Sequence, residues 1–187
     1  MPKTLGKSFF DRPTLKVSKE LLGKFLVRRY RGKNIALMII EVEAYDGFED
    51  RASHASRGKT ERNKIMFGPA GSWYIYFVYG LHWMLNIVTG PESYPAAILI
   101  RSGVLDKGRV VNGPAKLTKF LKIGKSAVRI INGKPADRKT GLWLEDRGIR
   151  VSKKKIQRSV RIGVDYAGPI WSKKLWRFYI ENGICNS

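Results

Sequence analysis

The sequence predicts a single α+β domain in which a few helices accompany a curved antiparallel sheet or open barrel. Short apolar and alternating runs, typical of strands, recur along most of the chain, whereas only two segments have helix boundaries formed by proline and glycine. The length of 187 residues suits one domain. No internal repeat, low-complexity tract or Pro/Gly-rich linker divides residues 1–187.

The first half of the chain is expected to contain a short helix and two hairpins. Residues 13–24 form the helix, because Pro13 is tolerated in a first turn and Gly23 can end it. The predicted strands are Leu22–Tyr30, Ile35–Tyr45 and a pair within 72–88 that turns near Tyr79-Gly80. A long polar loop runs from Asp46-Gly47 to about Gly71, and such loops are usually functional or mobile.

The second half is expected to contain one helix and five short strands. Pro114–Ile123 forms the helix, with proline at its start and Gly124 after it. The predicted strands are Ala96–Arg101, Leu142–Glu145, Ile149–Ser152, Val160–Val164 and Arg177–Ile180.

Composition indicates a polyanionic partner. Lys and Arg number 36 against 15 Asp and Glu, which gives a net charge of +21 and a pI of about 10.3. Nucleic acid is the favoured partner, ahead of an anionic membrane surface or a merely soluble lysine-rich exterior. No apolar run reaches the ~18 residues of a membrane helix, and the N-terminus lacks a signal-peptide core. We therefore expect a soluble intracellular protein.

Metal and disulfide chemistry are not expected. Cys185 is the only cysteine, and His54 and His82 are the only histidines, so neither a disulfide framework nor a cluster of zinc ligands can be built from these residue types.

The strongest candidate site is a pair of acids at the end of the apolar strand Ile35–Tyr45. Side chains alternate along a strand, so Glu41, Glu43 and Tyr45 should share one face. One acid can then titrate high and serve as a base while the other stays ionised. Glu43 is preferred as the base, because it lies nearer the strand end, where a ligand could reach it. The alternative is a structural pair neutralised by Arg101 or another cation.

Two other segments fit a nucleic-acid partner. An apolar hairpin tip at Tyr79-Gly80-Leu81 is a poor choice for solubility but suits insertion into a base stack. It could instead pack against another part of the protein. The polar loop offers small and cationic residues for phosphate contacts, unless it is simply a solvated basic loop. The candidates for backbone contact are Arg57, Lys59, Thr60 and Arg62.

These residues together resemble a known family in order and over nearly the whole chain. The matching segments are Glu43-Ala44-Tyr45, Asp50, His54, Arg57-Gly58, Arg62-Asn63, Met66-Phe67, Tyr74-Ile75-Tyr76, Tyr79-Gly80, Asn86-Ile87, Arg101, 112–117, 161–164, Ala167-Gly168 and 177–179. The sequence is similar to the alkyladenine (3-methylpurine) DNA glycosylases. The resemblance implies a fold like the C-terminal domain of methionyl-tRNA formyltransferase. It also implies a monofunctional base-excision-repair enzyme that uses no cofactor or metal.

Such an enzyme would flip a damaged nucleotide out of duplex DNA and hydrolyse its N-glycosidic bond, leaving an abasic site. The implied substrates are 3-methyladenine, 7-methylguanine and hypoxanthine. The implied roles are as follows: Glu43 activates water, assisted by Arg101 and the backbone carbonyl near Ile162; Tyr45, His54 and Tyr76 sandwich the base; Asn86 excludes guanine; Tyr79 intercalates with Leu81 beside it.

Two dipeptides depart from the family pattern. His82-Trp83 and Asp165-Tyr166 replace residue pairs found in other members, which puts substrate range in doubt rather than reaction class. The main alternative function is a non-catalytic protein that binds DNA or structured RNA. A scanning enzyme of one domain would most naturally be a monomer associated with DNA in the cytoplasm or nucleoid, with no membrane partner.

Overall fold

The computed structural model describes residues 2–181, which form ten strands and five α-helices. The strands are β1 (Lys3–Thr4), β2 (Phe25–Tyr30), β3 (Lys33–Asp46), β4 (Trp73–Val78), β5 (His82–Val88), β6 (Ala96–Val104), β7 (Val110–Val111), β8 (Leu142–Asp146), β9 (Ile156–Ser159) and β10 (Arg177–Ile180). The helices are α1 (Lys7–Phe10), α2 (Thr14–Leu21), α3 (Pro114–Phe120), α4 (Lys125–Ile131) and α5 (Gly168–Trp171). None of these helices is long and apolar enough to cross a membrane.

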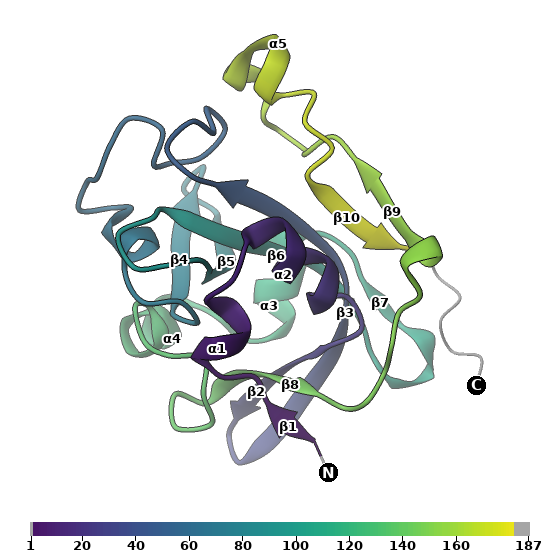
Figure 1. The fold of residues 1–187 in the computed structure, drawn as a ribbon. Helices are drawn as coiled ribbons and strands as arrows, with labels where there is room; N and C mark the ends of the chain where they lie inside the picture. The colour runs from purple at the N-terminus through teal and green to yellow at the C-terminus, as the bar shows by residue number, and fades with distance from the viewer. Residues whose placement is uncertain (1, 182–187) are drawn as a thin grey trace.

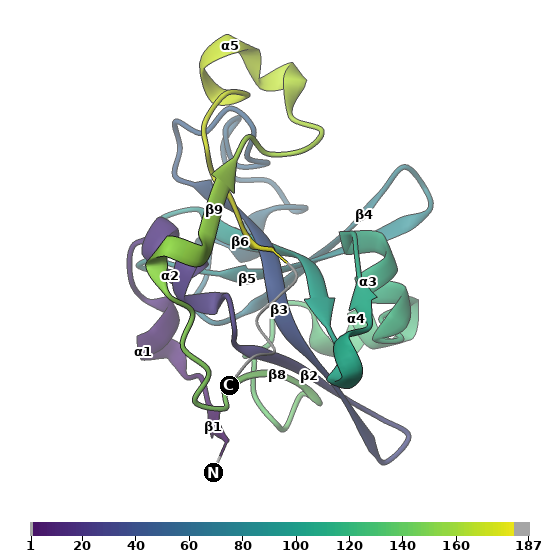
Figure 2. The same ribbon diagram turned by 90° about the vertical axis from the view of Figure 1, so that its right-hand side faces the viewer.

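The strands make one curled antiparallel sheet in the order β1-β8-β2-β3-β6-β5-β4 (Figure 1). β3 organises it, because its first half pairs with β2, its last part pairs with β10, and β6 runs along its other edge. Figure 2 shows α1 and α2 on one side of the sheet and α3 and α4 on the other. The predicted α+β class with a curved sheet is confirmed.

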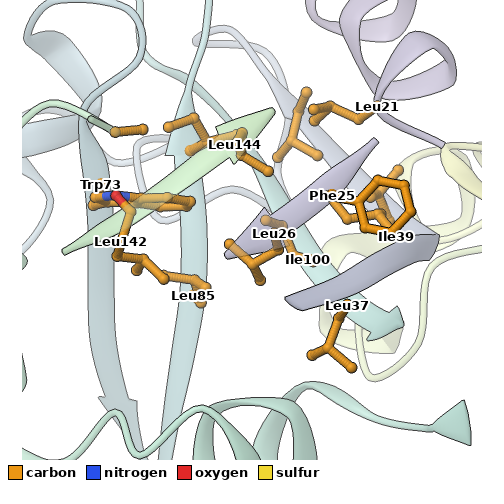
Figure 3. Packing of buried hydrophobic residues seen from close by; sticks show 14 of the residues in the cluster. Leu21, Phe25, Leu26, Leu37, Ile39, Trp73, Leu85, Ile100, Leu142 and Leu144 are labelled. Carbon is orange, nitrogen blue, oxygen red and sulfur yellow. The ribbon is translucent and has the colours of Figure 1, made fainter. Parts of the chain in front are cut away.

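A large apolar cluster fills the space inside the curl (Figure 3). Trp73 of β4 lies at one side of it, fully buried, and its indole N–H donates to the Leu142 carbonyl at 2.9 Å. Alternation along β4 sends Trp73 and Ile75 into this cluster and Tyr74 and Tyr76 into a smaller one on the opposite face. That second face carries the candidate site.

The pairing of β3 with β6 contains an irregularity that matters for function. Ile39 pairs with Gly103 and Val42 with Ile100, so Ile40 on one strand and Arg101 on the other fall outside the regular register. Bulges of this kind re-aim side chains and are frequent beside active sites. Arg101 lies at the irregularity itself.

Two predicted strands are wrong. Ile149–Ser152 has no ladder partner, although Ile149 and Val151 pack against the core. Val160–Val164 is a loop, because the Arg161 side chain turns inward and Gly163 adopts a φ of +75°. β9 lies just before this segment and does not overlap the predicted strand. The other predicted helices and strands are found, with boundaries shifted by at most three residues. The short elements that were missed are α1, α4, α5, β1, β7 and β9. Cys185 lies outside the described residues.

Replacing Trp73 tests the core. Trp73→Ala should lower the free energy of unfolding by about 3–5 kcal/mol, because it leaves a cavity and removes one of the two side-chain hydrogen bonds to the Leu142 carbonyl. Trp73→Phe keeps most of the volume and should cost clearly less. Urea unfolding followed by circular dichroism measures both variants. Equal losses would mean that the indole volume does not stabilise this core.

Candidate active site

The Glu43 carboxylate is the centre of the site and is fully buried on β3. Its Oε1 accepts a hydrogen bond from the Ile162 backbone N–H at 2.8 Å and lies 3.2 Å from Nη1 of Arg101. Its Oε2 accepts a hydrogen bond from the Tyr45 hydroxyl at 2.9 Å. A carboxylate offers about four lone-pair sites. Glu43 therefore keeps acceptor capacity for a water molecule.

Arg101 links the two acids of β3. Its Nε donates to Oε1 of Glu41 at 3.0 Å, while Nη1 contacts Glu43. Glu41 has two further partners, the Ser102 hydroxyl at 2.6 Å and Nη1 of Arg177 at 2.9 Å. Glu41, Glu43 and Tyr45 thus lie on one face, as the alternation predicted.

The environment separates the two acids electrostatically. Burial raises the pKa of Glu43 above its usual range, although the Arg101 charge and two hydrogen bonds oppose the change. Burial acts in the same direction on Glu41, but its hydrogen bonds from Ser102 and Arg177 and the Arg101 charge together outweigh it and lower the pKa. One acid is placed to accept a proton, and the other is a fixed anion.

The prediction that Glu43 is accessible because it lies near the end of its strand is wrong. Its position near the strand end does not leave it open to solvent, because Ile162 and Tyr45 cover the carboxylate. What distinguishes it from Glu41 is the environment of its charge. Water can reach it only if the neighbouring groups move.

A pocket next to Glu43 collects the four residues predicted to bind a base. Its volume is about 40 Å³. It is lined by Tyr45, Ala52, Ser53, His54, Met66, Tyr74, Tyr76, Asn86, Ala97 and Tyr166. Tyr45 comes from β3, Tyr74 and Tyr76 from β4, His54 from the long polar loop and Tyr166 from the turn Asp165–Ala167, so residues distant in the sequence meet here.

The aromatic rings of the pocket contact one another. The centroids of His54 and Tyr76 lie 4.5 Å apart in an edge-to-face arrangement. A base stacked between two rings needs roughly 7 Å, twice an ordinary stacking separation. No base fits between His54 and Tyr76 in this arrangement, but a sandwich with Tyr45 on the other side of the base does not need these two rings to separate. Burial, and secondarily the Arg62 charge, lowers the pKa of His54, so the ring is neutral at neutral pH. Its Nδ1 lies 3.0 Å from the Tyr74 hydroxyl.

Asn86 is held in a fixed orientation at the pocket wall. It is buried on β5, and its amide nitrogen donates to the carbonyls of Tyr74 and Met84 at 3.1 and 3.3 Å. A fixed, buried amide can exclude a base by shape.

A buried ion pair joins the polar loop to the segment that follows β9. Both side chains of Asp50 and Arg161 are fully buried, with Nη2 of Arg161 donating to Oδ1 of Asp50 at 2.8 Å. Nη1 also donates to the Ala44 carbonyl at 2.9 Å, and the guanidinium lies over the Tyr45 ring. This contact places Ile162 against Glu43.

The hairpin tip between β4 and β5 is exposed, which rules out the alternative of packing within the protein. Tyr79 is 87% exposed and Leu81 is 73% exposed. Tyr79 has a φ of +53°, which is uncommon for a residue other than glycine. Strained backbone of this kind clusters at ligand-binding sites.

The basic loop lies on the outside of the pocket. Arg57, Lys59 and Thr60 are exposed, and so is Arg62. Arg62 donates to the Phe77 carbonyl at 3.2 Å and lies over the Tyr76 ring, which ties the loop to β4. Of the four residues predicted to contact a phosphate backbone, Arg62 is thus held against β4.

Several contacts were not found from the sequence. The hydrogen bond from the Ile162 N–H to Glu43 was not predicted, and the expected role of the backbone carbonyl near Ile162 stays a prediction. The Ser102 and Arg177 bonds to Glu41 and the Tyr166 wall of the pocket were also missed. The pairing register of β10 with β3 is the only signal that could have predicted the contact of Arg177 with Glu41.

Comparison with known proteins identifies the family of this chain. The sequence profile of the methylpurine-DNA glycosylase (MPG) family matches residues 8–183. The chain belongs to this family. It is therefore an enzyme of DNA repair, a hydrolase acting on N-glycosyl bonds, and not a non-catalytic binding protein.

Relatives from both archaea and bacteria match nearly end to end. A protein of Methanocella arvoryzae is 42% identical over 98% of this chain and 95% of its own length. One from Anaeromyxobacter sp. strain Fw109-5 is 41% identical over 95% and 89%, and one from Desulfitobacterium hafniense is 36% identical over 96% of both. All three carry the provisional name 3-methyladenine DNA glycosylase.

Opposite effects on stability are expected for the two acids. Because the pKa of Glu41 is lowered by folding, its stabilisation is present at neutral pH and is lost as pH falls through the folded-state pKa. For Glu43 the raised pKa reverses the sign, so stability falls as pH rises through that pKa.

At pH 7.5, Glu41→Gln should lower the free energy of unfolding by about 2–3 kcal/mol, since it leaves buried cations underpaired. Glu43→Gln should raise it by about 1 kcal/mol, as expected for a group kept for function. Urea unfolding of both variants at pH 7.5 provides the comparison. A loss of stability in Glu43→Gln would contradict the assignment of a destabilised carboxylate.

Proposed function

We propose that this protein removes alkylated and deaminated purines from duplex DNA by flipping the damaged nucleotide into the aromatic pocket and hydrolysing its N-glycosidic bond with water activated by Glu43. The observation that supports this most directly is the juxtaposition of Glu43, with its raised pKa, and the pocket wall formed by Tyr45, whose hydroxyl contacts the carboxylate. In this arrangement the pocket would hold the flipped base, and Glu43 would lie beside the sugar attached to that base.

Flipping leaves a gap in the duplex that a wedge can fill. Tyr79 is the candidate wedge, with Leu81 beside it, because both project from the hairpin tip with little contact to the protein. Inserted side chains of this kind offset part of the cost of unstacking. Arg57, Lys59 and Thr60 would contact the backbone from the adjacent loop. The net charge of +21 supplies salt-sensitive, sequence-independent affinity for scanning.

The chemistry needs a base and a stabilising anion, and Glu43 supplies both. A purine alkylated at N3 or N7 leaves as a neutral base from a cationic ring, so the positive charge passes to an oxocarbenium-like sugar. A carboxylate beside that sugar stabilises it and takes a proton from the attacking water. Arg101 contacts Glu43 and would help to orient the water, together with the backbone at Ile162. Water is the nucleophile, so the product is an intact abasic strand.

Selection of the base would combine stacking with exclusion. Weakly paired or damaged bases cost least to flip, which favours lesions before any contact in the pocket. Tyr45, His54 and Tyr76 would then stack on 3-methyladenine, 7-methylguanine or hypoxanthine. The fixed Asn86 side chain would crowd the 2-amino group of guanine. We further propose that the protein acts as a monomer on DNA inside the cell.

The role of Glu43 can be tested by Glu43→Gln. Single-turnover release of 7-methylguanine from a duplex, detected by strand cleavage in hot alkali, should fall by about 10²-fold or more. The wild-type rate should also fall as pH drops through the Glu43 pKa, whose half-point lies above the ordinary value of 4.5. Duplex binding should be unchanged, which a gel-shift control measures. Retained activity in Glu43→Gln would remove Glu43 from the role of base.

The wedge can be tested by Tyr79→Ser. Excision of hypoxanthine from a stably paired duplex should slow by about tenfold, in line with the ~1–3 kcal/mol of a stacked aromatic contact. The same lesion in a mismatched duplex, where flipping costs less, should be affected less. An equal rate on the paired duplex would refute the wedge.

A further inference from the structure

We propose that Tyr166 is a specificity-determining residue, the outer wall of the base pocket, which contacts the flipped base and limits its bulk. This proposal rests on the proposed function of the pocket. Tyr166 lines the pocket together with Tyr45, His54 and Tyr76. Its hydroxyl donates to the Ala52 carbonyl at 2.9 Å and so reaches across the mouth from one wall to the other.

The two sides joined by this bond come from segments that carry the rest of the site. Ala52 belongs to the polar loop, two residues before His54, and Tyr166 follows Ile162, whose N–H contacts Glu43. The two segments are packed together beneath the pocket wall, since Ala52, Val164 and Ala167 form one buried cluster. The wall therefore stands on a fixed support.

Tyr166 itself is free to swing. Its side chain is 71% exposed although one side of it lines the pocket, and the Ala52 bond is the hydrogen bond that holds it in the described residues. The turn Asp165–Ala167 is bounded by Gly163 and Gly168, with φ of +75° and +81°. Nothing in the described residues approaches either glycine within 4 Å of a Cβ position, so these glycines serve the backbone conformation and not close packing.

Such a movement would widen a narrow pocket. His54 and Tyr76 are in contact, and the pocket volume is about 40 Å³. Breaking one hydrogen bond, from its hydroxyl to the Ala52 carbonyl, frees the Tyr166 side chain, while Ala52 stays packed in the buried cluster. Once a base is inside, the phenol ring can return over its exposed face. A ring that closes in this way adds stacking for a methylpurine and excludes a bulkier adduct.

The test compares the inhibition constants of two free bases, 7-methylguanine and 7-benzylguanine, in competition with excision from a 7-methylguanine duplex. Tyr166→Ala should weaken binding of 7-methylguanine by about tenfold. It should weaken 7-benzylguanine less or improve its binding, so the ratio of the two constants narrows at least threefold. Tyr166→Phe keeps the ring and should restore the 7-methylguanine constant to within about threefold. The residual loss reports the Ala52 bond.

Ile170→Ala is the matched control, because Ile170 is 69% exposed on the following helix α5 but does not line the pocket. It should leave both constants unchanged. An unchanged ratio in Tyr166→Ala, whether both constants weaken or neither does, overturns the assignment.

Tyr76→Ala separates this proposal from the one on which it rests. If Tyr76→Ala weakens base binding and Tyr166→Ala does not, only the Tyr166 wall fails. If neither variant alters binding, or if the wild-type protein excises no methylpurine, the proposed pocket fails and the Tyr166 wall fails with it.

Discussion

The ion pair between Asp50 and Arg161 is the interaction on which the rest of the site depends. Both side chains are fully buried, so each charge would be costly without the other. Arg161 contacts the Ala44 carbonyl at the end of β3 and the Trp171 carbonyl at the end of α5, and Asp50 accepts backbone N–H bonds within its own loop. One guanidinium therefore joins the three segments that carry the acid, the pocket and the pocket's outer wall.

The register irregularity between β3 and β6 gives Glu41 and Glu43 different surroundings. It aims Arg101 between Glu41 and Glu43. Glu41 gains Ser102 and Arg177 as further donors and remains an anion, which holds the arginine in place. Glu43 shares that arginine but is buried more completely, so its proton affinity rises. The raised pKa of Glu43 is thus produced mainly by burial, and the Glu41 charge adds to it in the same direction.

Local patterns predicted the elements that present the site but not the contacts that assemble it. Alternation placed Glu41, Glu43 and Tyr45 on one face, and an apolar Tyr79-Gly80 turn predicted the exposed tip. Neither rule reaches Arg161, which was taken for part of a strand because its neighbours alternate. Its partner Asp50 lies 111 residues away, and Tyr166 bonds Ala52 across 114 residues. Such pairs depend on how the sheet curls, which no short window of sequence contains.

Contacts between segments that are far apart in the sequence also assemble the surroundings of Glu43 and the pocket beside it. Glu43 is desolvated by Tyr45, Ile162 and Arg101, each from a different segment, and a wholly open cleft could not raise its pKa by burial. A pocket that closes without its base keeps this environment and admits little water. Movement of the pocket walls would act on the edge contact of His54 with Tyr76, on the 3.0 Å contact of His54 Nδ1 with the Tyr74 hydroxyl, and on the bond of Tyr166 to Ala52. The proposed entry of a base does not require the buried contacts between Asp50 and Arg161 to break.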